Sequence, residues 1–193
     1  MKETINDINF IAIGVSAGGF EALSALVTQM PAKFSIPIAI VQHRSIDSGA
    51  YLAKHLDNKS QINVKDVFDK EPIKAGSVYL APPDYHLLVE RGEYFSLSRD
   101  EKVNYSRPSI DVFFETVAEI YPKKCLAIIL TGKNNDGAIG LAKIAATGGL
   151  AIVQDPKSAY ALEMPIAAIN NVPTATVLSL SGIVEYLLSI NQN

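Results

Sequence analysis

Continuous apolar runs of strand length, separated by segments with helical spacing, constrain the fold of this chain most strongly. The clearest runs are FIAIG at 10–14, IPIAIVQ at 36–42, CLAIIL at 125–130 and LAIVQD at 150–155. Between the first two, residues 18–30 place apolar side chains at helical intervals. Strands that are apolar on both faces are typical of parallel sheets covered by helices. We therefore predict an α/β fold, a doubly wound and mostly parallel sheet with helices on both faces.

The remaining segments fit this alternation, with one exception. Further helices are expected around 48–57 and over 108–121, 136–149, 164–171 and 180–191, and further strands over 62–67 and 175–179. The exception is 77–98, where Pro and Gly divide the chain into short runs with a turn at 91–93. This stretch predicts a small antiparallel hairpin insertion. We expect residues 1–193 to form a single domain.

Composition excludes several classes of protein. Apolar residues make up 48% of the chain and charged residues 19%, which is typical of a globular protein. The net charge of −3 gives no attraction to nucleic acid or anionic lipid. No apolar run approaches the ~20 residues of a membrane helix, and the N-terminus lacks an apolar signal region. We expect a cytoplasmic protein that neither binds nucleic acid nor inserts into a membrane.

Cysteine and histidine usage argues against disulfides and metals. Cys125 is the single cysteine, so no intrachain disulfide can form, and its place at the start of a buried strand indicates a core thiol. The histidines have no carboxylate at ligand spacing. His55 is expected to be solvated, and a structural role is favoured for His86 over a place in a cleft. No metal and no cofactor is expected.

A serine, a histidine and a carboxylate each follow the carboxyl end of an apolar strand. Ser16 follows 10–14, His43 follows 36–42, and Asp136 lies just beyond 125–130. Active sites of doubly wound sheets lie at this edge. Consecutive strands are usually neighbours, so Ser16 and His43 are expected to meet. Whether Asp136 joins them depends on where its strand lies in the sheet.

These residue types suit nucleophilic catalysis. A serine hydroxyl needs a base to remove its proton, and an imidazole oriented by a carboxylate is that base. Gly14-Val-Ser-Ala-Gly18 fits G-x-S-x-G, the strand-to-helix turn that exposes a serine hydroxyl. The N–H of Ala17 and the following helix could stabilise an oxyanion. We predict that Ser16, His43 and Asp136 are catalytic.

Each motif also has a simpler interpretation. A glycine-rich loop before a helix is also used to bind phosphate, so a nucleotide-binding α/β domain stays open. His43 alone could be a structural residue, and Asp136 alone could be a helix N-cap. The order serine, histidine, acid differs from the serine, acid, histidine order of α/β-hydrolases, which excludes that fold.

Seven blocks, in order along the chain, resemble the catalytic domain of the chemotaxis protein-glutamate methylesterases, the CheB type. The blocks are IGVSAGG (13–19), VQH (41–43), VYLAPPDYHL (78–87), RPSIDVFF (107–114), LTGKNNDGAIG (130–140), VQDPKSA (153–159) and MPIAA (164–168). The resemblance implies a triad of Ser16, His43 and Asp136. It implies hydrolysis of glutamate γ-methyl esters on a methylated chemoreceptor, with deamidation of receptor glutamine as a second activity.

Two features depart from this family. Only residues 1–8 precede the first predicted strand region, so we expect the family's receiver domain to be absent or its control to lie on another chain, such as a separate response regulator or kinase. The loop before the acid, usually similar to TGMGxDG, is TGKNNDG here. Lys133 and Asn134 thus replace an apolar residue and a glycine. We expect Ala17, Gly18 and Lys133 to contact the oxyanion or the substrate, and the changed loop leaves a catalytically weakened interaction module as an alternative.

Overall fold

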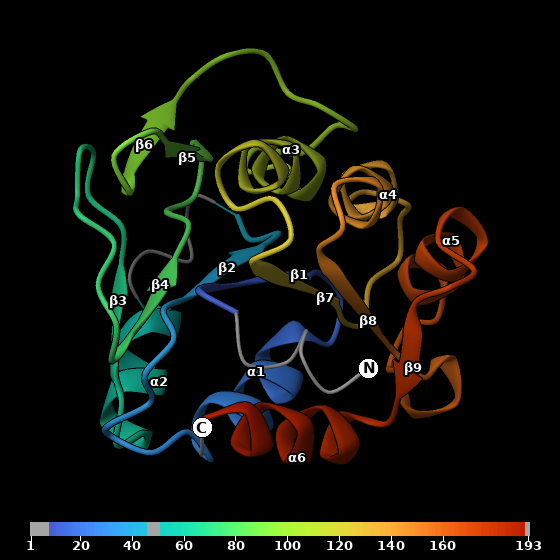
Figure 1. Cartoon of the computed structure of the whole chain (residues 1–193), viewed down its shortest axis with the longest axis horizontal. Coiled ribbons are helices and arrows are strands. Elements are labelled where there is room, and N and C mark those ends of the chain that lie inside the picture. Colours follow the sequence, from blue (N-terminus) through green and yellow to red (C-terminus); the bar gives the residue numbers. More distant parts are fainter. Residues whose placement is uncertain (1–7, 46–50, 192–193) are drawn as a thin grey trace.

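A parallel sheet lies between two layers of helices at the centre of the molecule (Figure 1). The computed structural model describes residues 8–45 and 51–191. In those residues the main sheet has seven strands in the order β3-β4-β2-β1-β7-β8-β9, and every neighbouring pair is parallel. The strands are β1 Phe10–Val15, β2 Ile38–Gln42, β3 Asn63–Asp66, β4 Ser77–Leu80, β7 Cys125–Ile129, β8 Leu150–Gln154 and β9 Thr176–Leu178.

Helices cover both faces of this sheet, as predicted. In Figure 1, α1, α2 and α6 lie on one side and α3, α4 and α5 on the other. Their bounds are α1 Gly19–Val27, α2 Tyr51–Lys59, α3 Ile110–Ile120, α4 Ala138–Ala146, α5 Glu163–Asn171 and α6 Leu180–Ile190, with a short 3₁₀ turn, η3, at Pro156–Ser158. The first residues of the helix expected around 48–57 lie outside the described residues.

Strand β1 contributes side chains to two hydrophobic cores, one on each face of the sheet. Its Ile11 and Ile13 pack with α1 and α6, whereas Phe10 and Ala12 pack with α3. Ala12 pairs in register with an alanine on each neighbouring strand. Further along, a Cβ atom on Gly14 would lie 2.4 Å from Cγ2 of Ile110. Small residues on this face therefore let the first turn of α3 approach the carboxyl end of β1.

The antiparallel insertion is confirmed, but it is smaller than predicted. Strands β5 (His86–Glu90) and β6 (Tyr94–Ser98) form a separate antiparallel pair that packs on α3. The expectation that 77–80 belongs to this insertion is wrong, because β4 lies between β3 and β2 in the main sheet. The reason is its burial: Val78, Tyr79 and Leu80 are all covered, so both faces of β4 need packing.

Candidate active site

The carboxyl ends of β1, β2 and β7 meet in the middle of the sheet, where the chain order reverses. Strand β2 lies on one side of β1 and β7 on the other. Such a switch point is where doubly wound folds place their ligands. Ser16 follows β1, His43 follows β2, and Asp136 lies between β7 and α4. The strand order thus supplies what the sequence left open, because the strand that leads to Asp136 is the second neighbour of the serine strand.

Backbone hydrogen bonds continue past the ends of the strands and align the three loops. The N–H of His43 donates to the carbonyl of Val15 over 3.1 Å, and the N–H of Ser16 donates to the carbonyl of Thr131 over 2.9 Å. Residues 16–18, between β1 and α1, form what we call the serine loop. This loop is therefore held between the other two loops by the same register that pairs the strands.

His43 and Asp136 are in direct contact. Nε2 of His43 lies 2.8 Å from Oδ2 of Asp136. The histidine side chain is 13% exposed and the aspartate side chain is fully buried. An ionised carboxylate only accepts hydrogen bonds, so Nε2 carries the proton and Nδ1 is the nitrogen with the free lone pair in the neutral ring.

The first turn of α3 surrounds the Asp136 carboxylate with donors. Oδ2 accepts from the N–H of Ile110 at 2.7 Å. Oδ1 accepts from Oγ of Ser109 at 2.8 Å, from the N–H of Asp111 at 3.1 Å and from Nδ2 of Asn104 at 3.2 Å. Burial by itself raises the pKa of Asp136, but the bonds from His43, Ile110 and Asp111 outweigh it and lower the pKa to about 2. Asp136 is therefore ionised at neutral pH.

The serine loop makes fewer hydrogen bonds than the Asp136 carboxylate. Ser16 is half-buried, and within residues 8–45 and 51–191 its hydroxyl makes no hydrogen bond. Ser16 and His43 are thus neighbours in the strand register with no hydrogen bond between their side chains. In the same ranges no acceptor engages the N–H groups of Ala17 and Gly18, at the start of α1. Gly18 has φ +77°, and a Cβ there would lie 2.5 Å from Cβ of Tyr160. The loop therefore offers a hydroxyl and two donors.

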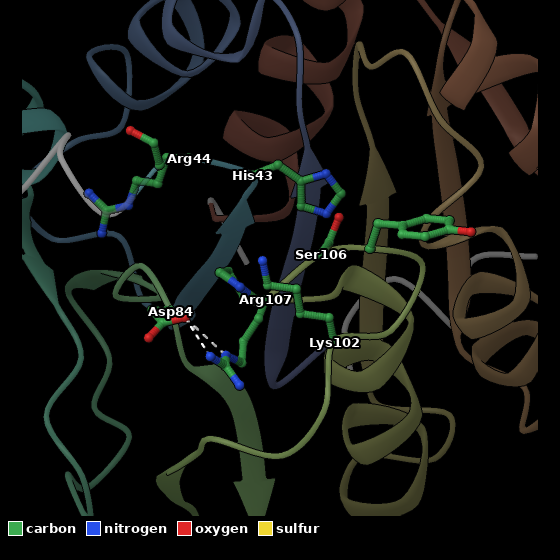
Figure 2. A pocket seen from close by; sticks show the side chains of 9 residues that line it. His43, Arg44, Asp84, Lys102, Ser106 and Arg107 are labelled. Atoms are coloured by element: carbon green, nitrogen blue, oxygen red, sulfur yellow. Dashed lines mark hydrogen bonds and ion pairs between the residues drawn. The ribbon is translucent and has the colours of Figure 1, made fainter.

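Two surface hollows lie beside the predicted site, one at His43 and one at Ala17 and Gly18. The first, of about 650 Å³, is lined by His43 together with Arg44, Lys102, Tyr105 and other residues (Figure 2). Its charges are partly compensated, since Arg107 donates to Asp84 at 2.6 Å.

The second hollow, of about 590 Å³, is lined by Ala17, Gly18, Glu21, Lys133 and Tyr160. Lys133 is exposed, and the described part of the chain contains no ion pair between it and Asp136. One hollow therefore adjoins His43, and the other adjoins Ala17 and Gly18.

Three residues that support Asp136 were missed by sequence reasoning: Asn104, Ser109 and Asp111. Ser109 and Asp111 have the sequence pattern of an ordinary helix start, and Ser109 does cap α3. Asp111 also accepts from the N–H of Gly140 at 2.7 Å and so ties α3 to α4. Burial, together with the charge of Asp136, raises the pKa of Asp111. Only the packing of α3 against β1 and α4 reveals these roles.

Three residues outside the predicted triad pack against other parts of the protein: His86, His55 and Cys125. His86 is 2% exposed, its Nε2 lies 3.0 Å from the carbonyl of Glu101 and its Nδ1 accepts from the N–H of Ser109, which confirms its structural role. His55 is half-buried and its ring contacts those of Phe20 and Tyr51, so the expectation of a solvated residue is only partly met. Burial raises the pKa of the Cys125 thiol to about 12, as suits a core residue.

The described residues contain neither a metal-binding cluster nor a membrane-spanning helix. No group of three or more Cys, His, Asp or Glu side chains in this part of the chain is arranged to hold a metal ion. No helix in it is long and apolar enough to cross a bilayer.

Comparisons with known proteins agree with this geometry. The family model described as CheB methylesterase matches residues 11–187. A putative protein-glutamate methylesterase/protein-glutamine glutaminase of Leptospira interrogans is 49% identical over 183 residues, which are 95% of each chain. The corresponding protein of Thermotoga maritima is 36% identical over 93% of this chain, but this covers only 53% of the relative.

The structural comparison points the same way. The crystal structure of the Thermotoga maritima CheB methylesterase catalytic domain matches with a TM-score of 0.90 and 35% identity. The match covers 95% of this chain and 98% of that domain. By sequence and by fold, this chain belongs to the CheB methylesterase family.

Proposed function

We propose that this protein hydrolyses glutamate γ-methyl esters of a chemoreceptor and releases methanol, and that it also deamidates glutamine residues of such a receptor. The observation that carries the proposal is the 2.8 Å contact between His43 and Asp136, next to the strand that leads to the half-buried Ser16. The names of the relatives, which pair methylesterase with glutaminase, support the same chemistry.

In the proposed mechanism, Ser16 is the nucleophile and His43 the general base. Nδ1 of His43 takes the hydroxyl proton as Oγ attacks the ester carbonyl, and Asp136 stabilises the resulting imidazolium. The N–H groups of Ala17 and Gly18 donate to the oxyanion of the tetrahedral intermediate. His43 then returns the proton to the departing methoxide, which leaves as methanol.

Hydrolysis of the acyl-enzyme completes the reaction. His43 activates a water molecule that attacks the Ser16 ester, and the product is a glutamate carboxylate. With a glutamine substrate the same steps release ammonia in place of methanol. A single set of residues therefore accounts for both proposed activities.

The proposal also includes the charge of the substrate segment and the compartment of the reaction. Lys133 and Lys102 place cations in the two hollows beside the site, which suits a receptor segment rich in acidic residues. The single cysteine, buried and free, is compatible with a reducing compartment, and we place the reaction in the cytoplasm. We propose that residues 1–193 form one catalytic domain and that a response regulator or kinase is among its partners.

Methanol release tests this function. Purified wild-type protein and Ser16→Ala are incubated with membranes that contain a methylated receptor, and methanol is measured over time. The proposal expects release by wild type and none above background by Ser16→Ala. A folded wild-type protein that releases no methanol and resists a serine-directed fluorophosphonate would contradict the proposal and favour an interaction module.

A further inference from the structure

The side chain of Asn134 lies against the one nitrogen of His43 that Asp136 leaves free. Nδ2 of Asn134 is 3.4 Å from Nδ1 of His43. This is the atom to which the proposed mechanism transfers the Ser16 proton. A 3.4 Å contact is long for a hydrogen bond, so it is weak enough to be exchanged during a reaction.

The orientation of this amide follows from its second contact. Oδ1 of Asn134 accepts from the N–H of Asp136 over 3.2 Å. A backbone N–H can only donate, so the oxygen must face it and the NH₂ group must face the histidine. On the other side of the ring, the Nε2–H group donates a hydrogen bond to Oδ2 of Asp136. Both contacts therefore agree on one state, a neutral imidazole whose Nδ1 lone pair faces a donor.

We infer that Asn134 is a positioning residue that covers Nδ1 of His43 in the resting site and must give way before this nitrogen can accept the Ser16 proton. The inference deepens the proposed function and rests on it for the role of Ser16. Once Nδ1 is protonated, two donors face each other, so the amide favours the neutral ring and opposes the imidazolium. Asn134 therefore makes His43 a slower base that keeps working at lower pH.

Other charged groups near His43 stay the same when Asn134 is changed. They are Asp136 at Nε2, Asp111 behind it, Arg44, Lys102, Arg107 and Asp84 around the first hollow, and Lys133 on the same loop as Asn134. A difference between variants at position 134 therefore reports on the amide itself.

The test measures kcat and KM for methanol release from pH 5 to 9 in four proteins: wild type, Asn134→Ala, Asn134→Asp and, as a control, Asn135→Ala. Asn135 is an exposed neighbour whose side chain makes no contact with His43 among the described residues. A neutral hydrogen bond is worth a factor of about 2 to 10 in an equilibrium. We expect Asn134→Ala to raise kcat by about that factor on the pH plateau, with KM unchanged, and to move the acid limb of the profile to higher pH.

Asn134→Asp separates this effect from a disturbed loop. It keeps an oxygen for the N–H of Asp136 but places a carboxylate at Nδ1, which favours the imidazolium. Its acid limb should move to still higher pH than that of Asn134→Ala, while Asn135→Ala should match wild type. If Asn134→Ala and Asn134→Asp both keep the wild-type limb, or lose kcat at every pH without moving it, the inference is wrong.

A second readout does not depend on the substrate. The ¹⁵N resonance of His43 Nδ1 should change in Asn134→Ala and not in Asn135→Ala. This readout stands even if no receptor is hydrolysed, in which case the proposed function fails and the contact at Nδ1 is still tested. An Nδ1 resonance that is the same in all three proteins would overturn the inference.

Discussion

Two halves of the site, the Asp136 region after β7 and the serine loop after β1, are built differently. On the β7 side, the Asp136 carboxylate is fully buried and accepts five hydrogen bonds, from His43, Ser109, Ile110, Asp111 and Asn104. In the serine loop, the described residues provide no partner for the hydroxyl or for the two N–H groups that follow it. The Asp136 half holds a charge in a fixed place, whereas the hydroxyl and the N–H groups of the serine loop have no hydrogen-bond partner among the described residues.

This difference matches what each half has to do. A buried carboxylate is stable only when donors surround it, and these donors also orient the histidine. A nucleophile and an oxyanion site must instead exchange partners with the substrate. The constrained half should therefore affect both stability and activity when it is changed, whereas the open half should affect activity most.

Among the changes that compare these two halves, the largest effect on stability and activity together is expected from Asp136→Asn. The amide can donate to Nε2 and so favour the wrong tautomer of His43, which should lower kcat by about 10³ to 10⁴. It also removes a pH-dependent contribution to folding. Because the pKa of Asp136 falls from 3.8 in the unfolded chain to about 2 in the folded protein, this contribution is present above pH 4 and is lost as the pH falls toward 2. Its size is on the order of 2 kcal/mol.

Denaturant unfolding between pH 2 and pH 7 measures this contribution. The free energy of unfolding should fall less steeply between pH 4 and pH 2 in Asp136→Asn than in wild type. Asp111 has a raised pKa that acts in the opposite direction, and the charge of Asp136 contributes to that shift. Its opposing contribution is therefore smaller in Asp136→Asn, which reduces the difference between the two proteins without reversing it. The exposed Asp100→Asn serves as the control and should follow wild type. Equal slopes in all three proteins would contradict the account of the buried carboxylate.

Gly18→Ala tests the serine loop, with Gly76→Ala as its match. Both glycines have a similar positive φ, +77° and +74°. A Cβ on Gly76 meets only the carbonyl of Ala32 at 3.9 Å, whereas on Gly18 it meets Tyr160 at 2.5 Å. Gly76→Ala should cost about 1 kcal/mol of stability, the strain of the left-handed backbone, and leave kcat unchanged. Gly18→Ala should cost about 2 to 4 kcal/mol and lower kcat, because the loop must move. Equal effects of the two changes would mean that Tyr160 does not constrain the loop.

Ser109→Ala and Ser179→Ala separate a helix cap from a site contact. Each serine caps its helix, α3 or α6. Ser179→Ala should lower the free energy of unfolding by about 1 kcal/mol. Ser109→Ala should lower it by about 2 to 4 kcal/mol, because it also removes a hydrogen bond to the buried carboxylate. Only Ser109 also donates to Asp136, so only Ser109→Ala should lower kcat, by about 2- to 10-fold. Thermal unfolding and steady-state kinetics of both variants provide the comparison, and an unchanged kcat in Ser109→Ala would show that the remaining donors suffice.

The smallest effect is expected from Lys133→Met. Lys133 is exposed and lines a hollow together with Ala17 and Gly18, so we expect it to affect substrate binding and not the stability of the site. An exposed charge contact is worth about 0.2 to 1 kcal/mol. KM should therefore rise about 1.5- to 5-fold, and less at high salt, with kcat and stability unchanged. A change in kcat with constant KM would instead assign Lys133 to the chemical step.

Much of the fold could be predicted because burial on both faces of a strand is visible in the sequence. The apolar runs at 10–14 and 125–130 became β1 and β7 with nearly the predicted bounds. The run at 77–80 was assigned to the wrong sheet because a short strand between Pro- and Gly-rich turns looks alike in a hairpin and in a parallel sheet. Only the pairing of β4 with β2 and β3 decides between them.

The candidate site could be predicted in part for a related reason. Ser16, His43 and Asp136 each follow a strand, so their shared edge of the sheet is a consequence of topology. The contacts of Asn104, Ser109 and Asn134 depend on how α3 and the loop after β7 pack in three dimensions. No spacing in the sequence encodes these contacts, and the sequence describes Ser109 only as a helix cap.

The most direct test of the central claim, that Ser16 and His43 act as one unit with Asp136, is a double-mutant cycle on methanol release. Ser16→Ala and His43→Ala should each lower kcat by about 10³ or more, with thermal unfolding close to that of wild type. The double variant should be no more than about threefold slower than the worse single variant, because residues that act together are lost together. Multiplicative losses in the double variant, or near-normal turnover by folded His43→Ala, would contradict the account.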